Sequence, residues 1–82
     1  MQAEVPVERI LLMESLASAI SQVDDGRELV RRQRDRIYAL GKAGRNTALA
    51  ELVLARLEAS QILRVAERER LEELLAALET EP

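Results

Sequence analysis

Apolar residues recur along the first half of the chain at alternating spacings of four and three. The repeat contains Leu12, Leu16, Ala19, Val23, Gly26, Val30, Gln33, Ile37 and Leu40. Such spacing keeps one narrow stripe facing a partner helix and is typical of coiled-coil packing. Pro6 fits the first turn of a helix, since its φ is compatible and its missing N–H is not needed there. We therefore predict a helix over about residues 6–41, roughly 50 Å long.

The sequence DDGRE, residues 24–28, leaves the continuity of this helix open. Asp25 followed three residues later by Glu28 has the form of a capping box. Gly26 inside a helix costs ~1 kcal/mol relative to alanine. A hinge at this point would divide the segment into two helices. Because the seven-residue repeat passes through the glycine without a skip, we prefer one long helix, either straight or kinked near Gly26.

The sequence GKAGRNT, residues 41–47, interrupts the repeat and predicts a turn. Gly41 or Gly44 can supply the left-handed residue that ends a helix, and Asn46 or Thr47 can cap the next one. Residues 48–78 contain neither Gly nor Pro. At 100° per residue, one broad apolar face of this segment contains Leu49, Val53, Leu57, Leu63, Leu71, Leu74, Leu75 and Leu78. We predict a second helix over about residues 47–79.

Two long helices joined by a short turn must pack antiparallel. The fold class is therefore all-α, with residues 1–82 forming a single helical-hairpin domain. A chain of 82 residues buries little surface as a monomer. Leu54, Ile62 and Val65 lie well off the main apolar face, and one hairpin cannot cover all of them. We expect two copies to pair into a dimeric four-helix bundle.

Charge is distributed unevenly along this hairpin. The chain has 12 basic and 15 acidic residues, a net charge of −3, and all but one of the basic residues are Arg. Residues 27–45 carry seven positive and two negative charges, a net of +5, whereas residues 1–26 carry one and five, and residues 64–82 carry three and six. The hairpin is thus a rod with a basic tip and an acidic open end. This polarity favours a second copy packed in the opposite direction.

Polar residues interrupt both apolar stripes at the same height. If the hairpin turns near residue 45, facing residue numbers sum to about 89, which places Asp25 beside Arg64 and Asp24 near Arg64 or Arg68. We predict that these four residues form an ionic layer. Such a layer adds little net stability, because desolvation offsets the Coulomb attraction, but it fixes the register and the partner.

The arginine-rich segment before the turn is the main candidate for a functional site. The same pairing places Arg31 beside Glu58 and leaves five basic residues without an intrachain partner: Arg32, Arg34, Arg36, Lys42 and Arg45. Tyr38, the only aromatic residue, is either an anchor for a partner or a half-buried rim residue. A nucleic-acid-binding domain is expected to be basic and to have more aromatic residues. We therefore favour protein contacts, with a second copy or an acidic protein partner, over DNA or RNA.

The sequence offers little for catalysis, metal binding or membrane insertion. It has no Cys and no His, which removes thiolate chemistry and the commonest metal ligand and general base. The sequence ERERLEE, residues 67–73, is typical of a solvated helix face. No apolar run approaches the roughly 18 residues of a membrane helix, and the first twenty residues lack a basic leader. We expect a cytoplasmic, non-enzymatic protein without a metal or cofactor.

One motif spans the predicted turn and a little over a third of the chain. It reads Q-R-x-x-I-x-x-L, then a Gly turn ending in Thr, then A-x-x-x-L and L-E-x-S, with matching positions Gln33, Arg34, Ile37, Leu40, Gly44, Thr47, Ala50, Leu54, Leu57, Glu58 and Ser60. In this motif the chain resembles a group of small, mostly uncharacterised helical proteins of alphaproteobacteria. Members often have a His shortly after the last element, and this chain has none. The resemblance implies a helical hairpin of bacterial origin and transfers no catalytic residues.

These observations predict a small interaction or regulatory module that self-associates through coiled-coil-like packing. Two alternatives stay open. A nucleic-acid-binding regulator would use the basic tip, and its binding would weaken steeply with salt. A coiled-coil subunit of a larger assembly would be poorly structured alone and would become ordered on meeting its partner.

Overall fold

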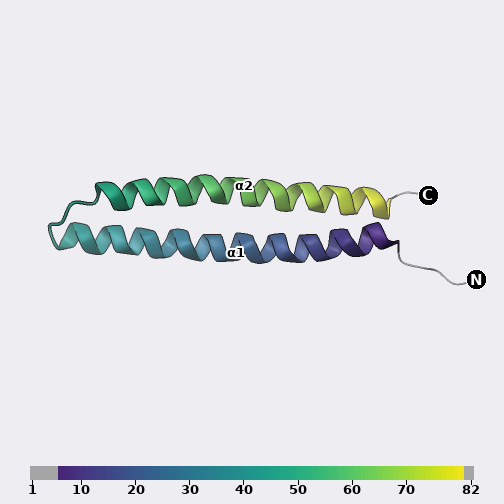
Figure 1. The fold of residues 1–82 in the computed structure, drawn as a ribbon, viewed down its shortest axis with the longest axis horizontal. Helices are drawn as coiled ribbons and strands as arrows, with labels where there is room; N and C mark the ends of the chain where they lie inside the picture. Colours follow the sequence, from purple (N-terminus) through teal and green to yellow (C-terminus); the bar gives the residue numbers. More distant parts are fainter. Residues whose placement is uncertain (1–5, 81–82) are drawn as a thin grey trace, which may run out of the picture.

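The computed structural model describes residues 6–80, which form two antiparallel helices joined by a short turn (Figure 1). Helix α1 spans Val7–Lys42 and helix α2 spans Ala48–Glu79. The two helices lie side by side, so that α2 ends beside the start of α1. No strand occurs within residues 6–80. The predicted all-α hairpin is confirmed, and the helix bounds are close to those expected.

Helix α1 is a single helix that passes through Gly26 without interruption. The alternative of two helices with a hinge at the DDGRE sequence is therefore wrong. Pro6 lies immediately before the first helical residue, with φ −57°. Its carbonyl accepts hydrogen bonds from the backbone N–H groups of Arg9 (3.0 Å) and Ile10 (3.2 Å). Two N–H groups of the first turn, which have no partner within the helix, are thereby satisfied.

Gly44 ends α1. Its φ is 71°, a left-handed conformation that glycine adopts without the penalty of a Cβ. Its N–H donates to the Gly41 carbonyl (3.0 Å), and the N–H of Arg45 donates to the Leu40 carbonyl (2.9 Å). These two hydrogen bonds form the Schellman motif, which satisfies carbonyls that the helix end leaves free. Of the two glycines considered for this role, Gly44 fills it.

Asn46 starts α2. Its side-chain oxygen accepts a hydrogen bond from the N–H of Ala48 at 2.8 Å. Thr47, the other candidate, instead donates its hydroxyl hydrogen to the Glu51 carboxylate at 2.7 Å. Both side chains therefore stabilise the first turn of α2, and the chain reverses direction within five residues.

The face of α1 that packs on α2 is the predicted one. Ala19, Val23, Gly26 and Val30 are buried along its middle, and Leu12, Leu16, Gln33, Ile37 and Leu40 are half-buried toward its ends. These residues keep the alternating four and three spacing throughout. The seven-residue repeat therefore identifies the packing seam of α1 correctly.

The packing face of α2 differs from the predicted one. Leu71 is buried and Leu57, Leu75 and Leu78 are half-buried as expected, but Leu49, Val53, Leu63 and Leu74 are exposed. The residues that face α1 repeat at three and four: Ala50, Leu54, Leu57, Gln61, Arg64, Arg68, Leu71, Leu75 and Leu78. Leu54 thus belongs to the seam, while Ile62 is exposed and Val65 is half-buried. A single partner helix covers only a narrow stripe of a helix that has apolar residues on several sides.

The hairpin is long and thin and has a small core. Its Cα radius of gyration is 19.0 Å, against about 12 Å for a compact domain of this length. Among the described residues, only Val23 has a large side chain that is fully buried. An ion pair between Arg9 and Glu79 (2.8 Å) joins the helices at the open end. Within residues 6–80, neither helix has a stretch that is both apolar and long enough to cross a membrane.

Candidate functional site

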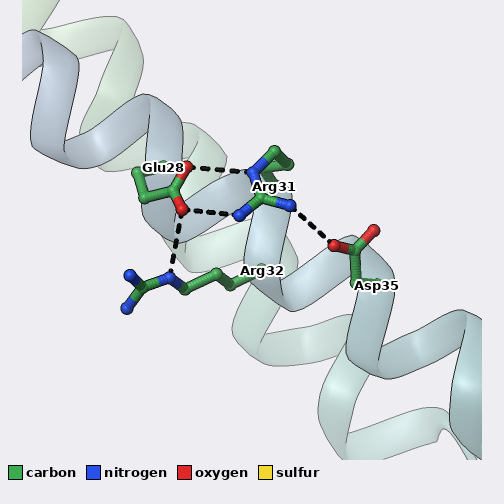
Figure 2. A network of polar contacts seen from close by, with 4 residues as sticks. All are labelled: Glu28, Arg31, Arg32 and Asp35. Carbon is green, nitrogen blue, oxygen red and sulfur yellow. Dashed lines mark hydrogen bonds and ion pairs between the residues drawn. The ribbon is translucent and has the colours of Figure 1, made fainter.

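Arg31 lies at the centre of a charged network on the surface of α1 (Figure 2). It donates two hydrogen bonds to the Glu28 carboxylate (2.6 and 2.9 Å) and one to Asp35 (2.9 Å). The hydrogen bond from Arg31 is the main reason that the pKa of Glu28 is lowered from 4.5 to about 2. Arg31 and Glu58 line the same groove but form no ion pair among the described residues, because Arg31 pairs with carboxylates three and four positions away on its own helix.

Two of the five basic residues expected to lack intrachain partners have one. Arg32 pairs with Glu28 at 3.2 Å, and Arg34 crosses to α2 and pairs with Glu58 at 2.7 Å. Arg36, Lys42 and Arg45 take part in no ion pair within the part of the chain that the structure describes. The free positive charge at the tip is therefore smaller than the sequence indicates.

Tyr38 and Lys42 occupy adjacent turns at the tip end of α1. Tyr38 is 62% exposed and is therefore not a half-buried rim residue in the single hairpin; its role as an anchor for a partner stays a prediction. The Lys42 ammonium lies 5.4 Å from the centroid of the Tyr38 ring, within the range of a cation–π contact. The tip thus presents one aromatic ring and one ammonium together on its surface.

The predicted ionic layer is not formed within a single hairpin. Asp24 pairs with Arg27 on its own helix at 3.4 Å, and Arg68 lies 4.0 Å from a glutamate one turn further along α2. Within residues 6–80, no ion pair joins Asp24 or Asp25 to Arg64 or Arg68. The reason is geometric, because both aspartates fall between two seam positions of α1 and project to the flanks of the hairpin.

A glutamine joins the helices at this height instead. The Gln61 side-chain N–H donates to the Val23 carbonyl at 2.7 Å. It passes directly over Gly26, where a Cβ would overlap the Gln61 side-chain oxygen and lie 3.0 Å from Nη1 of Arg64. Oε1 of Gln61 and Nη1 of Arg64 are both buried without a hydrogen-bond partner among the described residues. Gly26 is therefore needed for the close approach of α2.

A second glutamine repeats this arrangement toward the tip. The Gln33 side-chain N–H donates to the Ala50 carbonyl at 2.8 Å. Each helix thus contributes one seam glutamine that bonds to the backbone of the other helix opposite a small residue. These two hydrogen bonds fix the axial register of α1 relative to α2. The sequence placed Gln33 in the repeat, but it did not reveal Gln61, whose only signal is a polar residue one turn after the apolar seam residue Leu57.

An open groove of about 1280 Å³ runs along one flank of the hairpin. Its apolar lining consists of Val30, Ile62, Val65 and Ala66, and charged side chains form its rim. The arginines of the rim, Arg27, Arg31 and Arg34, are all held in ion pairs within the chain. The groove therefore offers an apolar floor with a rim whose charges are already paired.

No group of three or more His, Cys, Asp or Glu within residues 6–80 is placed to hold a metal ion. No protein-family model, curated protein or solved structure matches the chain. The resemblance of Arg31–Ser60 to small alphaproteobacterial helical proteins stays a prediction.

Proposed function

We propose that this chain is a small, non-enzymatic interaction or regulatory module that works as a self-associated four-helix bundle. In this form two hairpins pack face to face and bury apolar side chains that one hairpin leaves in water. The module would present the remaining charged surface, including the tip with Tyr38, to a protein partner.

The observation that carries the proposal is the apolar surface that the hairpin leaves uncovered. Among the described residues, thirteen large apolar side chains are at least 40% exposed, whereas the buried apolar core contains only five residues, two of them alanines. Monomeric proteins rarely expose large contiguous apolar patches. A helix that is apolar on several sides is expected to have more than one packing partner.

The total surface area supports the same conclusion. The chain exposes 6492 Å², whereas a compact monomer of 9.2 kDa exposes about 4,900 Å². The excess is roughly 1,600 Å², and a stable interface takes about 800 Å² from each partner. One hairpin therefore has enough surplus surface for a dimer interface.

Size-exclusion chromatography with light scattering, recorded at 260 and 280 nm, tests this proposal. We expect a peak at twice the 9.2 kDa chain mass. The chain has one Tyr and no Trp, so co-purified nucleic acid would dominate the absorbance. A helical monomer at every accessible concentration would overturn the proposal. A heavier peak that absorbs strongly at 260 nm and disappears in high salt would replace it with nucleic-acid binding at the tip.

A coiled-coil subunit of a larger assembly is the other alternative, and circular dichroism distinguishes it. A self-sufficient bundle should be strongly helical by itself and should unfold cooperatively. An isolated chain with little helix, which gains helix only on mixing with another protein, would favour the assembly subunit.

A further inference from the structure

The hairpin has two flanks, one on each side of the seam between its helices. The groove lies on one flank, and Ile62 is among the residues that line it. A small hollow of about 170 Å³ lies on the other, lined by Gln22, Asp25, Gly26, Leu29 and Arg64. Ile62 and Leu63 lie between the seam positions Gln61 and Arg64. At about 100° per residue, they project to opposite flanks, so Leu63 lies on the side of the hollow.

The flank with the hollow has large apolar side chains near both ends of α2 and at its middle. Along α2 this flank consists of positions 49, 53, 56, 60, 63, 67, 70, 74 and 77, of which Leu49, Val53, Leu63, Leu74 and Ala77 are apolar and Arg56, Ser60, Glu67 and Arg70 are polar. We call this side the leucine flank, and its large apolar residues are Leu11, Leu29, Leu49, Val53, Leu63 and Leu74. All six are at least 40% exposed in the single hairpin.

We propose that a second copy of this chain packs on the leucine flank in the opposite direction, with α1 on α1, α2 on α2, and a two-fold axis beside Leu63. This inference rests on the proposed self-association and specifies its face and its axis. The groove flank is then left on the outside of the bundle, once for each copy.

The order of residues along α2 fits a two-fold axis at this point. Leu63 would lie opposite Leu63 of the second copy. Leu49 and Ala77 are each fourteen residues from Leu63, and Val53 and Leu74 are ten and eleven residues away. An antiparallel contact of α2 with its copy therefore places apolar residues opposite apolar residues at its middle and at its two ends, whereas Arg56 faces Arg70 and Ser60 lies near Glu67 between them.

The two-fold axis that passes beside Leu63 of α2 also passes beside the middle of α1. On its leucine flank, Ser18 would face Leu29 and Gln22 would face Asp25 of the second copy, with the centre beside Val23. The hydrogen bond from Gln61 to the Val23 carbonyl (2.7 Å) shows that this point lies level with the middle of α2. A single two-fold axis requires both centres to lie at one height, and the hairpin satisfies this requirement.

Charge favours the antiparallel over the parallel orientation. Residues 27–45 carry a net charge of +5, and residues 6–26, with one positive and four negative charges, carry −3. The antiparallel contact places these oppositely charged halves of α1 against each other. The parallel arrangement would instead place residues 6–26 against residues 64–80 of the copy, which carry three positive and five negative charges. That contact joins two acidic segments.

In this arrangement a carboxylate of the second copy lies beside the hollow, where it can accept a hydrogen bond from Arg64. Among residues 6–80, Nη1 of Arg64 is buried without a hydrogen-bond partner, and Asp25 of the same chain lines the hollow without pairing with it. Asp25 of the second copy faces Gln22, on the edge of the hollow. Its carboxylate can therefore accept a hydrogen bond from Arg64, so that the ionic layer expected within one chain forms between two.

Cysteine cross-linking tests the face directly, because the chain contains no Cys. Leu63→Cys and Ile62→Cys are a matched pair, adjacent on α2 and 71% and 69% exposed. Under mild oxidation of the folded protein, we expect Leu63→Cys to form a covalent dimer rapidly, since a residue at a two-fold axis meets its own copy. Ile62→Cys should stay reduced, because the two groove flanks face away from each other.

The outcomes separate this inference from the proposed function. Suppose that the unmodified chain is a dimer by light scattering. If Ile62→Cys then cross-links at least as fast as Leu63→Cys, or if neither variant cross-links, the inferred face is wrong and self-association stands. If the unmodified chain is a monomer, both fail. As a second measurement, Leu63→Glu should raise the dimer Kd ~10-fold or more, while Ile62→Glu leaves it unchanged. Equal effects of the two glutamates would also overturn the inference.

Discussion

Replacing Gly26 with alanine tests the closest approach between the two helices. A Cβ at this position would overlap the side-chain oxygen of Gln61, lie 2.9 Å from its Cδ and lie 3.0 Å from Nη1 of Arg64. The Gln61 amide would have to move, and its 2.7 Å hydrogen bond to the Val23 carbonyl would be lost. The structure therefore predicts that the effect of Gly26→Ala depends on residue 61.

The size of the effect follows from three opposing contributions. Alanine favours the helix by ~1 kcal/mol over glycine. Loss of the Gln61 hydrogen bond costs ~1 kcal/mol, and repacking an overfilled site costs at least ~1 kcal/mol more. We expect Gly26→Ala to lower the free energy of unfolding by about 1 kcal/mol, the net of these terms. With Gln61 shortened to alanine, only Nη1 of Arg64, the end of a flexible side chain, stays close to the new Cβ. Gly26→Ala should then raise the free energy of unfolding by ~1 kcal/mol.

Urea unfolding followed by far-UV circular dichroism measures this double-mutant cycle, with an expected coupling of about 2 kcal/mol between positions 26 and 61. All variants are compared at one protein concentration, because self-association makes stability depend on concentration. Gly41→Ala is the control, since a Cβ there meets nothing within 4 Å. If Gly26→Ala stabilises the protein equally with Gln61 and with alanine at position 61, the described packing of Gln61 over Gly26 is wrong.

Three further predictions follow from single sites. Leu71→Glu places a charge at a seam position that is 5% exposed and should lower the free energy of unfolding by ~3–5 kcal/mol. The control Leu52→Glu, at a site 57% exposed, should change the free energy of unfolding by less than ~0.5 kcal/mol. Similar thermal midpoints for the two variants would contradict the assignment of Leu71 to the seam. Gly44→Ala forces alanine to φ 71° and should destabilise the hairpin by ~1–2 kcal/mol in urea unfolding, while Gly41→Ala should not. Because the hydrogen bond from Arg31 holds the pKa of Glu28 at about 2, below its ordinary 4.5, the stability that this carboxylate contributes is complete above pH 4.5 and is lost as the pH falls through about 2. Glu28→Gln should lack that part of the pH dependence, and urea midpoints of both proteins measured across this range should converge at low pH.

The features that depend on residues near one another in the chain are predictable from sequence. The seam of α1 is one, because its repeat is unbroken from Leu12 to Leu40 and the other sides of the helix are largely polar. The turn is another, since the hydrogen bonds that end α1 and start α2 lie within a few residues of Gly44 and Asn46. Two helices and a short turn leave an antiparallel hairpin as the simple arrangement.

The tertiary structure decided which side of α2 is covered and which partners the polar seam residues have. Helix α2 has apolar residues on several sides, so its sequence does not distinguish Leu54, which lies in the seam, from Leu63, which is exposed. Arginines such as Arg31 and Arg34 can reach several carboxylates, and their choice depends on side-chain geometry as well as on spacing. The bond from Gln61 to the Val23 carbonyl joins residues 38 positions apart. It exists only because the absence of a side chain at Gly26 lets the second helix approach there, and that height is set by the packing of the whole seam.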